Sequence, residues 1–171
     1  MRRVAAALIG MAVLAQAPAA FAQGSASGSI TAQANVLTPV SVTPQQDLDF
    51  GNVIPGTNKS VAITGATAGR WLVEGTADAE VDLDFTALPA TLSNGPDTLP
   101  IVYSSVDAGH NAVNVPGGAT VFDPTTGTTT NIGTPGATLF VWIGGTVQPA
   151  GVQPAGLYTG TITLQATYTG N

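Results

Sequence analysis

The sequence contains no cysteine, a single histidine and only four basic residues. Without cysteine the chain can hold neither a disulfide framework nor a lipid-modified cysteine anchor, so packing alone must stabilise its core. Metal sites and catalytic triads would need partner residues that one histidine cannot supply. Charged residues make up only 8% of the chain, so Thr, Gly, Ala, Ser, Asn and Pro supply the surface, as is common in exported all-β proteins.

The first 22 residues have the organisation of a signal peptide. Arg2 and Arg3 form a basic start, residues 4–15 are a short apolar run, and residues 20–22 give the small-x-small pattern of a cleavage site. The run is too short to span a bilayer, which needs roughly 20 residues. We therefore expect cleavage after Ala22, a mature chain without a membrane span, and export to the periplasm, the cell surface or the medium.

Positive charge is scarcer still in the predicted mature chain. Lys59 and Arg70 are its only bases, whereas all ten acidic residues lie within it. Nucleic acids and anionic lipids are bound through clusters of lysine and arginine, and this chain has no such cluster. The composition therefore argues against nucleic acid and anionic membranes as partners.

Apolar and polar residues alternate along several stretches with the period of two that marks a half-buried strand. The clearest alternation, over residues 158–168, is expected to form the closing strand. Further short strands are predicted at 59–64, 70–75, 78–85, 99–103 and 119–122. No amphipathic helical pattern follows the leader. Roughly eight to ten short strands with frequent turn signals predict an all-β fold, a single antiparallel β-sandwich over residues 23–171.

Three segments carry more specific predictions. Residues 24–42 predict an N-terminal edge strand broken near Pro39, because proline cannot donate to a ladder. Residues 137–147 are apolar on both faces, which indicates a central strand or one that covers something outside the sandwich, and Gly144 marks a bulge or a close backbone approach. Residues 104–136 are dense in Gly, Thr, Asn and Pro and are expected to be a loop-rich insertion with one short strand.

Residues 47–56 are expected to turn apolar side chains inward without forming a regular alternation. Leu48 and Phe50 are the predicted core residues of this segment, joined by Val53 or Ile54. A Pro-Gly pair then ends the segment in a turn.

Asp78, Glu80, Asp82 and Asp84 form an acidic row on one face of a predicted strand. Calcium prefers several carboxylate oxygens at about 2.3–2.6 Å, whereas alternate strand residues are roughly 6.6 Å apart, so one ion cannot collect all four. Two of these residues with a neighbouring loop could form a calcium site, but the calcium-loop pattern is absent. We interpret the row as a solvated face that keeps a sheet edge soluble, and predict no metal site.

Residues that could support catalysis lack partners in the sequence. Asp47 and Asp49 share a face, but no nucleophile or base lies near them, and they are expected at a turn or an edge. His110 is expected to be a solvated loop residue, and no second histidine is available to activate the many Ser and Thr hydroxyls. The sequence therefore predicts a protein that is not an enzyme and uses no cofactor.

Aromatic residues offer a further candidate, a platform that stacks sugars. The larger aromatic residues in question are Trp71, Tyr103, Trp142, Tyr158 and Tyr168. Aromatic residues in alternating strands belong more often to a core or an interface, and we favour that interpretation. Tyr158 follows a Pro and a Gly at the start of a late strand, which resembles the tyrosine corner of immunoglobulin-like sandwiches.

Three segments together carry a family resemblance. They are LDFGNVIPG at 48–56, the turn LSNG with DTL within 92–99, and residues 140–168 with GGTV and AGLYTG. In this order and spacing, and over about residues 33–168, they resemble the bacterial domain-of-unknown-function family 4402. That family is similar to spore-coat-U and chaperone–usher pilin domains, which are exported immunoglobulin-like sandwiches that build surface fibres. The resemblance implies a pilin-like fold and a structural or adhesive role at the envelope, although many of those pilins carry a disulfide.

An unprotected strand edge supplies the physical argument about function. Soluble β-proteins usually protect edge strands with lysine, proline or inward charge, but the predicted N-terminal strand carries small polar residues and Pro39. We predict that residues 25–42 either complete their own sandwich or insert into a neighbour by strand addition. The predicted function is a pilin-like structural or adhesive subunit, with itself or other envelope proteins as partners. The alternative is a stand-alone secreted or periplasmic binding module, an adhesin for glycan or protein that uses the loops around 104–136.

Overall fold

The structure is a computed structural model that describes residues 24–170. The chain divides into two units, residues 1–35 and 36–171. Of the first unit the structure describes residues 24–35, which form no strand or helix and are exposed throughout. The predicted signal peptide lies outside the described residues. The predicted N-terminal edge strand is wrong in its first part, because pairing begins only at Ser41.

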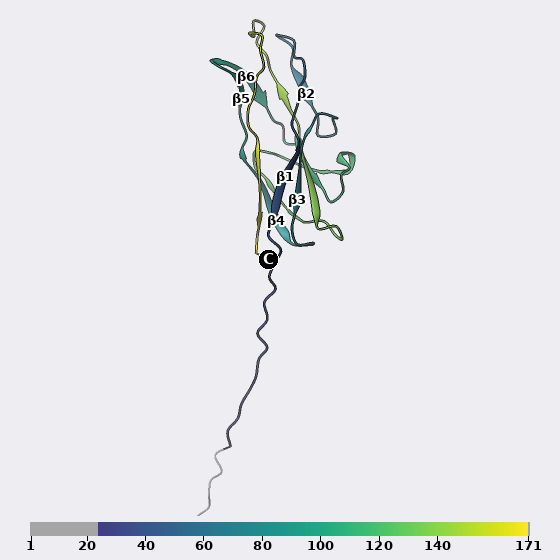
Figure 1. Ribbon diagram of the computed structural model, residues 1–171, viewed down its shortest axis with the longest axis vertical. Coiled ribbons are helices and arrows are strands. Elements are labelled where there is room, and N and C mark those ends of the chain that lie inside the picture. The colour runs from purple at the N-terminus through teal and green to yellow at the C-terminus, as the bar shows by residue number, and fades with distance from the viewer. Residues whose placement is uncertain (1–23, 171) are drawn as a thin grey trace, which may run out of the picture. The chain divides into compact units, whose positions relative to one another are not determined.

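The described part of the second unit, residues 36–170, holds twelve strands in three antiparallel sheets (Figure 1). The first sheet has the spatial order β1 (Ser41–Gln46), β3 (Gly69–Glu74), β10 (Thr138–Ile143), β7 (Ala108–Asn111) and β8 (Thr120–Phe122). The second has the order β2 (Lys59–Val61), β11 (Gly145–Val147), β6 (Asp97–Val102) and β5 (Thr91–Asn94). The third has the order β12 (Thr163–Tyr168), β4 (Glu80–Ala87) and β9 (Thr128–Asn131). This is the predicted all-β sandwich, with one short 3-10 turn at Pro116–Gly118.

The main core lies between the five-stranded and the three-stranded sheets. Val73 and Val141 come from the first sheet, and Val81, Leu83 and Leu164 come from the third. The alternation of β3, β4 and β12 explains this packing, because every second side chain of each strand points inward. Aromatic rings complete this core, with Trp71 edge-on to Phe85 at 5.8 Å between ring centroids.

A second core is built on the four-stranded sheet. Leu99, Ile101 and Val147 come from β6 and β11, and Phe50 packs on them from the segment that follows β1. The half-buried Tyr158 reaches the same cluster from the segment that precedes β12. One side of this core is therefore a sheet, whereas two segments outside the strands cover the other side.

Gly144 allows one continuous segment to serve two sheets. It separates β10 from β11, and its N–H donates to the carbonyl of Asp107 at 2.7 Å. A side chain at this position would collide with the carbonyl oxygen of Val61. The predicted close backbone approach is confirmed, as is the prediction of a central strand, since β10 lies between β3 and β7 and Trp142 on its second apolar face is buried.

Two further predictions are corrected by the fold. Residues 104–136 hold β7, β8 and β9 rather than one short strand, because strands rich in Thr, Gly and Asn lack the apolar alternation that marks a strand in sequence. The closing strand begins at Thr163 rather than at residue 158. In the segment after β1, Phe50 is buried and Leu48 and Val53 pack against the second core, as predicted, whereas Ile54, the alternative to Val53, points to solvent.

No helix in residues 24–170 has the length and apolar character that crossing a membrane requires.

Candidate functional site

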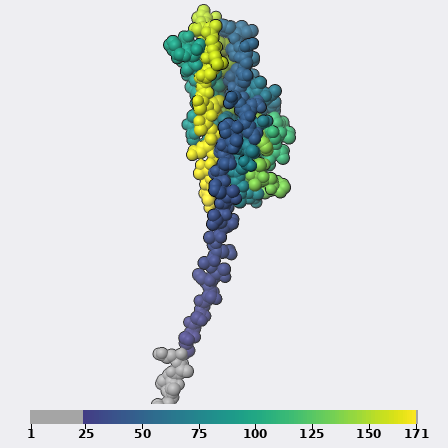
Figure 2. Space-filling model, viewed as in Figure 1, coloured from purple at the N-terminus to yellow at the C-terminus, as the bar shows by residue number. Residues whose placement is uncertain are grey.

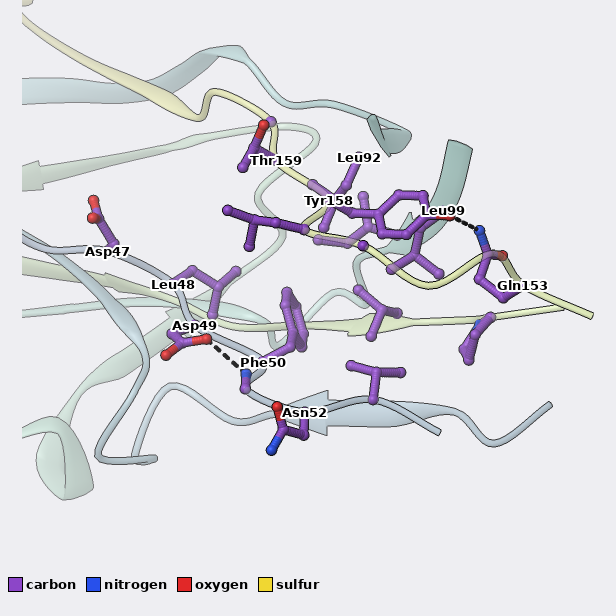
Figure 3. A pocket seen from close by; sticks show the side chains of 18 of the residues that line it. Asp47, Leu48, Asp49, Phe50, Asn52, Leu92, Leu99, Gln153, Tyr158 and Thr159 are labelled. Carbon is purple, nitrogen blue, oxygen red and sulfur yellow. Dashed lines mark hydrogen bonds between the residues drawn. The ribbon is translucent and has the colours of Figure 1, made fainter. Parts of the chain in front are cut away.

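An open groove of about 1130 Å³ lies over the second core of the domain (Figure 3). Two segments far apart in the sequence form its walls, residues 44–55 and residues 153–162. Figure 2 shows these parts of the chain, blue and yellow, running side by side on one face of the second unit. Apolar residues of the sheet beneath form the floor, Leu92, Leu99, Ile101 and Val147. We call this feature the groove.

The first wall leaves the sheet at the end of β1. After Gln46 the chain no longer pairs with β3, although the N–H of Asp49 still donates to the carbonyl of Thr67 at 3.0 Å. The carboxylate of Asp49 then accepts the N–H of Gly51 at 2.6 Å, and Gly51 adopts a φ of 59° that suits glycine. This local turn holds Phe50 in the second core while the polar side chains of the wall face outward.

The second wall is fixed by a tyrosine. The Tyr158 hydroxyl donates to the carbonyl of Pro154, four residues upstream, at 2.9 Å. It accepts a hydrogen bond from the side chain of Gln153 at 2.8 Å, and the same amide group of Gln153 donates to the carbonyl of Thr98 at 3.0 Å. The predicted tyrosine corner is therefore present in its hydrogen bonding, and it ties the wall to the second sheet.

Beyond Tyr158 the second wall is only lightly paired. An isolated bridge joins Thr159 to Ser93, with N–O distances of 2.8 and 3.0 Å. Regular pairing with β4 starts at Thr163. Most residues of 154–162 are consequently exposed, although the polar-apolar alternation of this stretch is that of a strand.

β1, which begins the first wall, and β12, which follows the second wall, are both sheet edges, and they lie against each other. β1 pairs with β3 alone, and β12 pairs with β4 alone, so each presents one unpaired backbone edge. At the end of the domain away from the groove, Tyr168 of β12 is hydrogen-bonded to the segment just before β1. Its hydroxyl donates to the carbonyl of Thr38 at 2.8 Å. The same hydroxyl accepts the N–H of Thr76 at 2.7 Å.

The groove combines an apolar floor with polar walls. Its floor is apolar, and the charged side chains on its walls are the exposed carboxylates of Asp47 and Asp49. These two residues were predicted at a turn or an edge, and they flank the start of the first wall. Amide side chains of Gln46, Asn52 and Gln153 supply the remaining larger polar groups. Such a lining suits a partly apolar occupant and disfavours an anionic one.

The acidic row is divided by the structure. Asp78 has a φ of 64° and precedes β4, while Glu80, Asp82 and Asp84 lie on β4. The interpretation as a sheet edge is wrong, because β4 lies between β12 and β9. The carboxylate of Asp82 accepts a hydrogen bond from the hydroxyl of Thr129 at 2.6 Å, which links this face of β4 to the neighbouring strand β9. Within residues 24–170, no three His, Asp or Glu side chains are grouped to hold a metal ion.

His110 lies in β7 and not in a solvated loop, which corrects the prediction. Its ring is half-buried and lies 6.0 Å from the ring of Phe122 between centroids. This burial lowers the pKa of His110 below its ordinary value of 6.5. The residue therefore belongs to the rim of the main core.

The large aromatic residues do not gather into one exposed platform. Trp71 and Trp142 are buried, as the favoured interpretation predicted. The hydroxyls of Tyr158 and Tyr168 fix the two ends of the domain through hydrogen bonds. Tyr103 is half-buried with no hydrogen-bond partner for its hydroxyl, and burial raises its pKa to about 12.

The groove itself was not predicted. Its walls come from segments about one hundred residues apart in sequence, and no local pattern reports that they lie together. A signal was nevertheless present in the prolines, since Pro44, Pro55, Pro149 and Pro154 all line it. Proline cannot donate to a ladder, so a cluster of prolines near two strands indicates an incomplete edge.

Comparison with known proteins identifies a family for this fold and groove. Residues 40–168, which span both groove walls and all twelve strands, match the family model described as Domain of unknown function (DUF4402). No curated protein and no solved structure matches the chain. The match covers most of the sequence and confirms the resemblance found in its three segments. The chain belongs to the DUF4402 family.

Proposed function

We propose that this protein is an exported, non-enzymatic structural or adhesive component of the cell envelope, and that its groove accepts an extended β-strand. The single observation that carries the proposal is the open groove over the second core, whose walls, residues 44–55 and 153–162, lie mostly outside the regular strands. The signal-peptide pattern of residues 1–22 supports export. The family resemblance to pilin-like domains favours the same role.

The dimensions of the groove support a polypeptide occupant over a small molecule. Its volume of about 1130 Å³ is slightly above the roughly 300–1,000 Å³ of typical small-molecule pockets, and its two walls are both chain segments of about ten residues. An added strand would pair with the backbone edges and place alternate side chains on the apolar floor. Main-chain hydrogen bonds then provide affinity, and the floor provides selectivity.

A groove variant tests this proposal. Ile162 lines the groove, whereas Thr161 is exposed and does not line it. Ile162→Lys introduces a charge where the added strand would pack, and is expected to abolish assembly of the purified exported protein. Thr161→Lys is the matched control and should assemble like the unaltered chain. Light scattering and electron microscopy measure assembly, and circular dichroism verifies that both variants are folded.

The outcome also separates the proposal from its alternative. A folded Ile162→Lys variant that assembles normally would exclude the groove as the site of strand addition. A chain that remains a clean monomer under all conditions, but captures an extended peptide from another envelope protein, would favour the stand-alone binding module.

A further inference from the structure

The outward surface of the five-stranded sheet, which we call the outer face, carries apolar side chains that belong to neither core. Leu72 of β3 lies opposite Phe140 of β10, and both alternate with core residues, so they point away from the main core. Both are half-buried, and we call this pair the shelf. The ring of Phe140 stacks with that of Trp142, two residues along, at 6.1 Å between centroids. The outer face therefore presents apolar surface that the two cores do not use.

Trp142 is buried on the outer face because two loops fold over the sheet beside it. It lies opposite Gly109 of β7. A side chain at Gly109 would place its Cβ 2.8 Å from Cδ1 of Ile63 and 3.3 Å from Cβ of Ala119. These two residues belong to the connections that precede β3 and β8. The loops thus bury one end of the aromatic pair and leave the shelf half-exposed.

The guanidinium of Arg70 lies beside the shelf without an acidic partner. Arg70 is opposite Trp142, and its side chain is half-buried, with an Nε that is buried and has no hydrogen-bond partner. Its NH1 donates at 3.3 Å to the amide oxygen of Asn114, and no carboxylate within residues 24–170 bonds to it, although all ten acidic residues lie in that range. Glu74, the acidic residue of the same face, is four residues along β3 and thus roughly 13 Å away. Partly buried cations are normally paired, so an anion from outside the chain would satisfy this group.

The other side chains of the outer face indicate what kind of anion fits. Thr43 of β1 lies opposite Leu72, and Ser41 lies opposite Glu74, and all three polar residues are exposed. Hydroxyl and carboxylate groups at this rim can exchange hydrogen bonds with a ligand rich in hydroxyls. Glu74 would repel a second negative charge, so the ligand should carry one carboxylate at the Arg70 end and neutral hydroxyls at the other. A sugar ring combines these groups with an apolar C–H face that can pack on the shelf.

We propose that the outer face binds an acidic saccharide, with a sugar carboxylate on Arg70 and the ring on Phe140 and Leu72. Arg70 exchanges its long hydrogen bond to Asn114 for paired, charge-assisted bonds to the carboxylate, which are shorter and stronger. This inference rests on the adhesive part of the proposed function and adds a ligand class to it. It does not depend on the groove, because none of Arg70, Leu72 and Phe140 lines that feature.

Matched acidic and neutral sugars test the site in the full exported chain. The probes are disaccharides with one uronic acid (glucuronic, galacturonic or mannuronic) and the methyl ester of each, which keeps the ring and removes the charge. Calorimetry and the fluorescence of Trp142 should show saturable binding of at least one acid, with its ester about tenfold weaker or more, since hydrogen bonds to charged groups contribute more than neutral ones.

Variants of the outer face assign the roles. Arg70→Gln should lose the preference for acid over ester, and Arg70→Lys should keep part of it, because an ammonium retains the charge but not the paired N–H groups. Phe140→Ala should weaken acid and ester alike. Lys59→Gln is the matched control: it removes the other base of the predicted mature chain, on β2 in a different sheet, and should bind like the unaltered protein. Circular dichroism verifies that each variant is folded.

Three results would overturn the inference. They are the absence of saturable binding for every acid, equal binding of acid and ester, and an unchanged preference in folded Arg70→Gln. Equal binding of acetyl-Gly-Gly-Phe, a carboxylate without a sugar ring, would likewise overturn the assignment to a saccharide. Failure here is distinct from failure of the groove, because Arg70→Gln should assemble normally and Ile162→Lys should bind the acidic sugar normally.

Discussion

The two cores of the domain are covered in different ways. The main core lies between two sheets, and Val73, Leu83 and Val141 in it are fully buried. The second core has a sheet on one side and, on the other, two segments that leave the groove between them. The difference separates a core that is closed on both sides from one that is partly open, and on our proposal the open side is the surface that receives a partner.

The comparison predicts that stability depends on the main core far more than on the groove end. Leu83→Ala removes a fully buried side chain from β4 and should lower the free energy of unfolding by about 2–5 kcal/mol. Leu157→Ala, at an exposed position of the second groove wall, should change it by no more than about 0.5 kcal/mol in the monomer. Urea unfolding of both monomeric variants measures the difference, and equal effects would refute this prediction.

An intermediate effect is expected at the second groove wall. Tyr158→Phe removes the hydroxyl that bonds to Pro154 and Gln153, and should lower the free energy of unfolding by about 1–2 kcal/mol, since a typical hydrogen bond contributes about 0.5–1.5 kcal/mol. Amide exchange in residues 154–162 should become faster. Tyr168→Phe is the counterpart at the other end of the domain and should leave exchange in that wall unchanged. If both variants accelerate amide exchange in residues 154–162 equally, Tyr158 has no local role in fixing this wall.

The smallest effect is expected for the pH dependence of the free energy of unfolding, through His110 at the rim of the main core. Burial lowers the pKa of His110 in the folded state, so the unfolded chain binds more protons as the pH falls below 6.5. Stability from the neutral ring is fully present above pH 6.5 and is lost progressively at lower pH. His110→Gln should reduce this slope in unfolding experiments between pH 8 and pH 5. An identical slope in the variant would assign the pH dependence to other groups.

The sequence predicted the main core better than the groove. Val81, Leu83, Leu164 and Ala166 alternate with polar residues, and this pattern depends only on which face of a strand is buried. The same rule extended strands too far at 158–162, where the alternation persists without a regular ladder. Periodicity reports a face but not a partner, so it cannot distinguish a paired strand from one that awaits pairing.

The other errors have equally physical causes. A strand was predicted over 24–42, but regular pairing begins only at Ser41, the first residue of β1. The small side chains before Ser41 offer little apolar surface to bury. β7 and β9 escaped prediction because cross-strand pairing, rather than apolar alternation, holds Thr128–Asn131 beside β4. The groove depends on contacts between distant segments and could not be derived from either segment alone.

Amide hydrogen exchange at the two edges of the five-stranded sheet tests the central claim most directly. β1 borders the groove and β8 lies at the opposite edge, so β8 serves as an internal control. If the groove accepts a strand, amides of β1 and of residues 159–162 should exchange more slowly in assembled full-length protein than in monomer, with β8 unchanged. Equal exchange of these amides in both fractions would contradict the account.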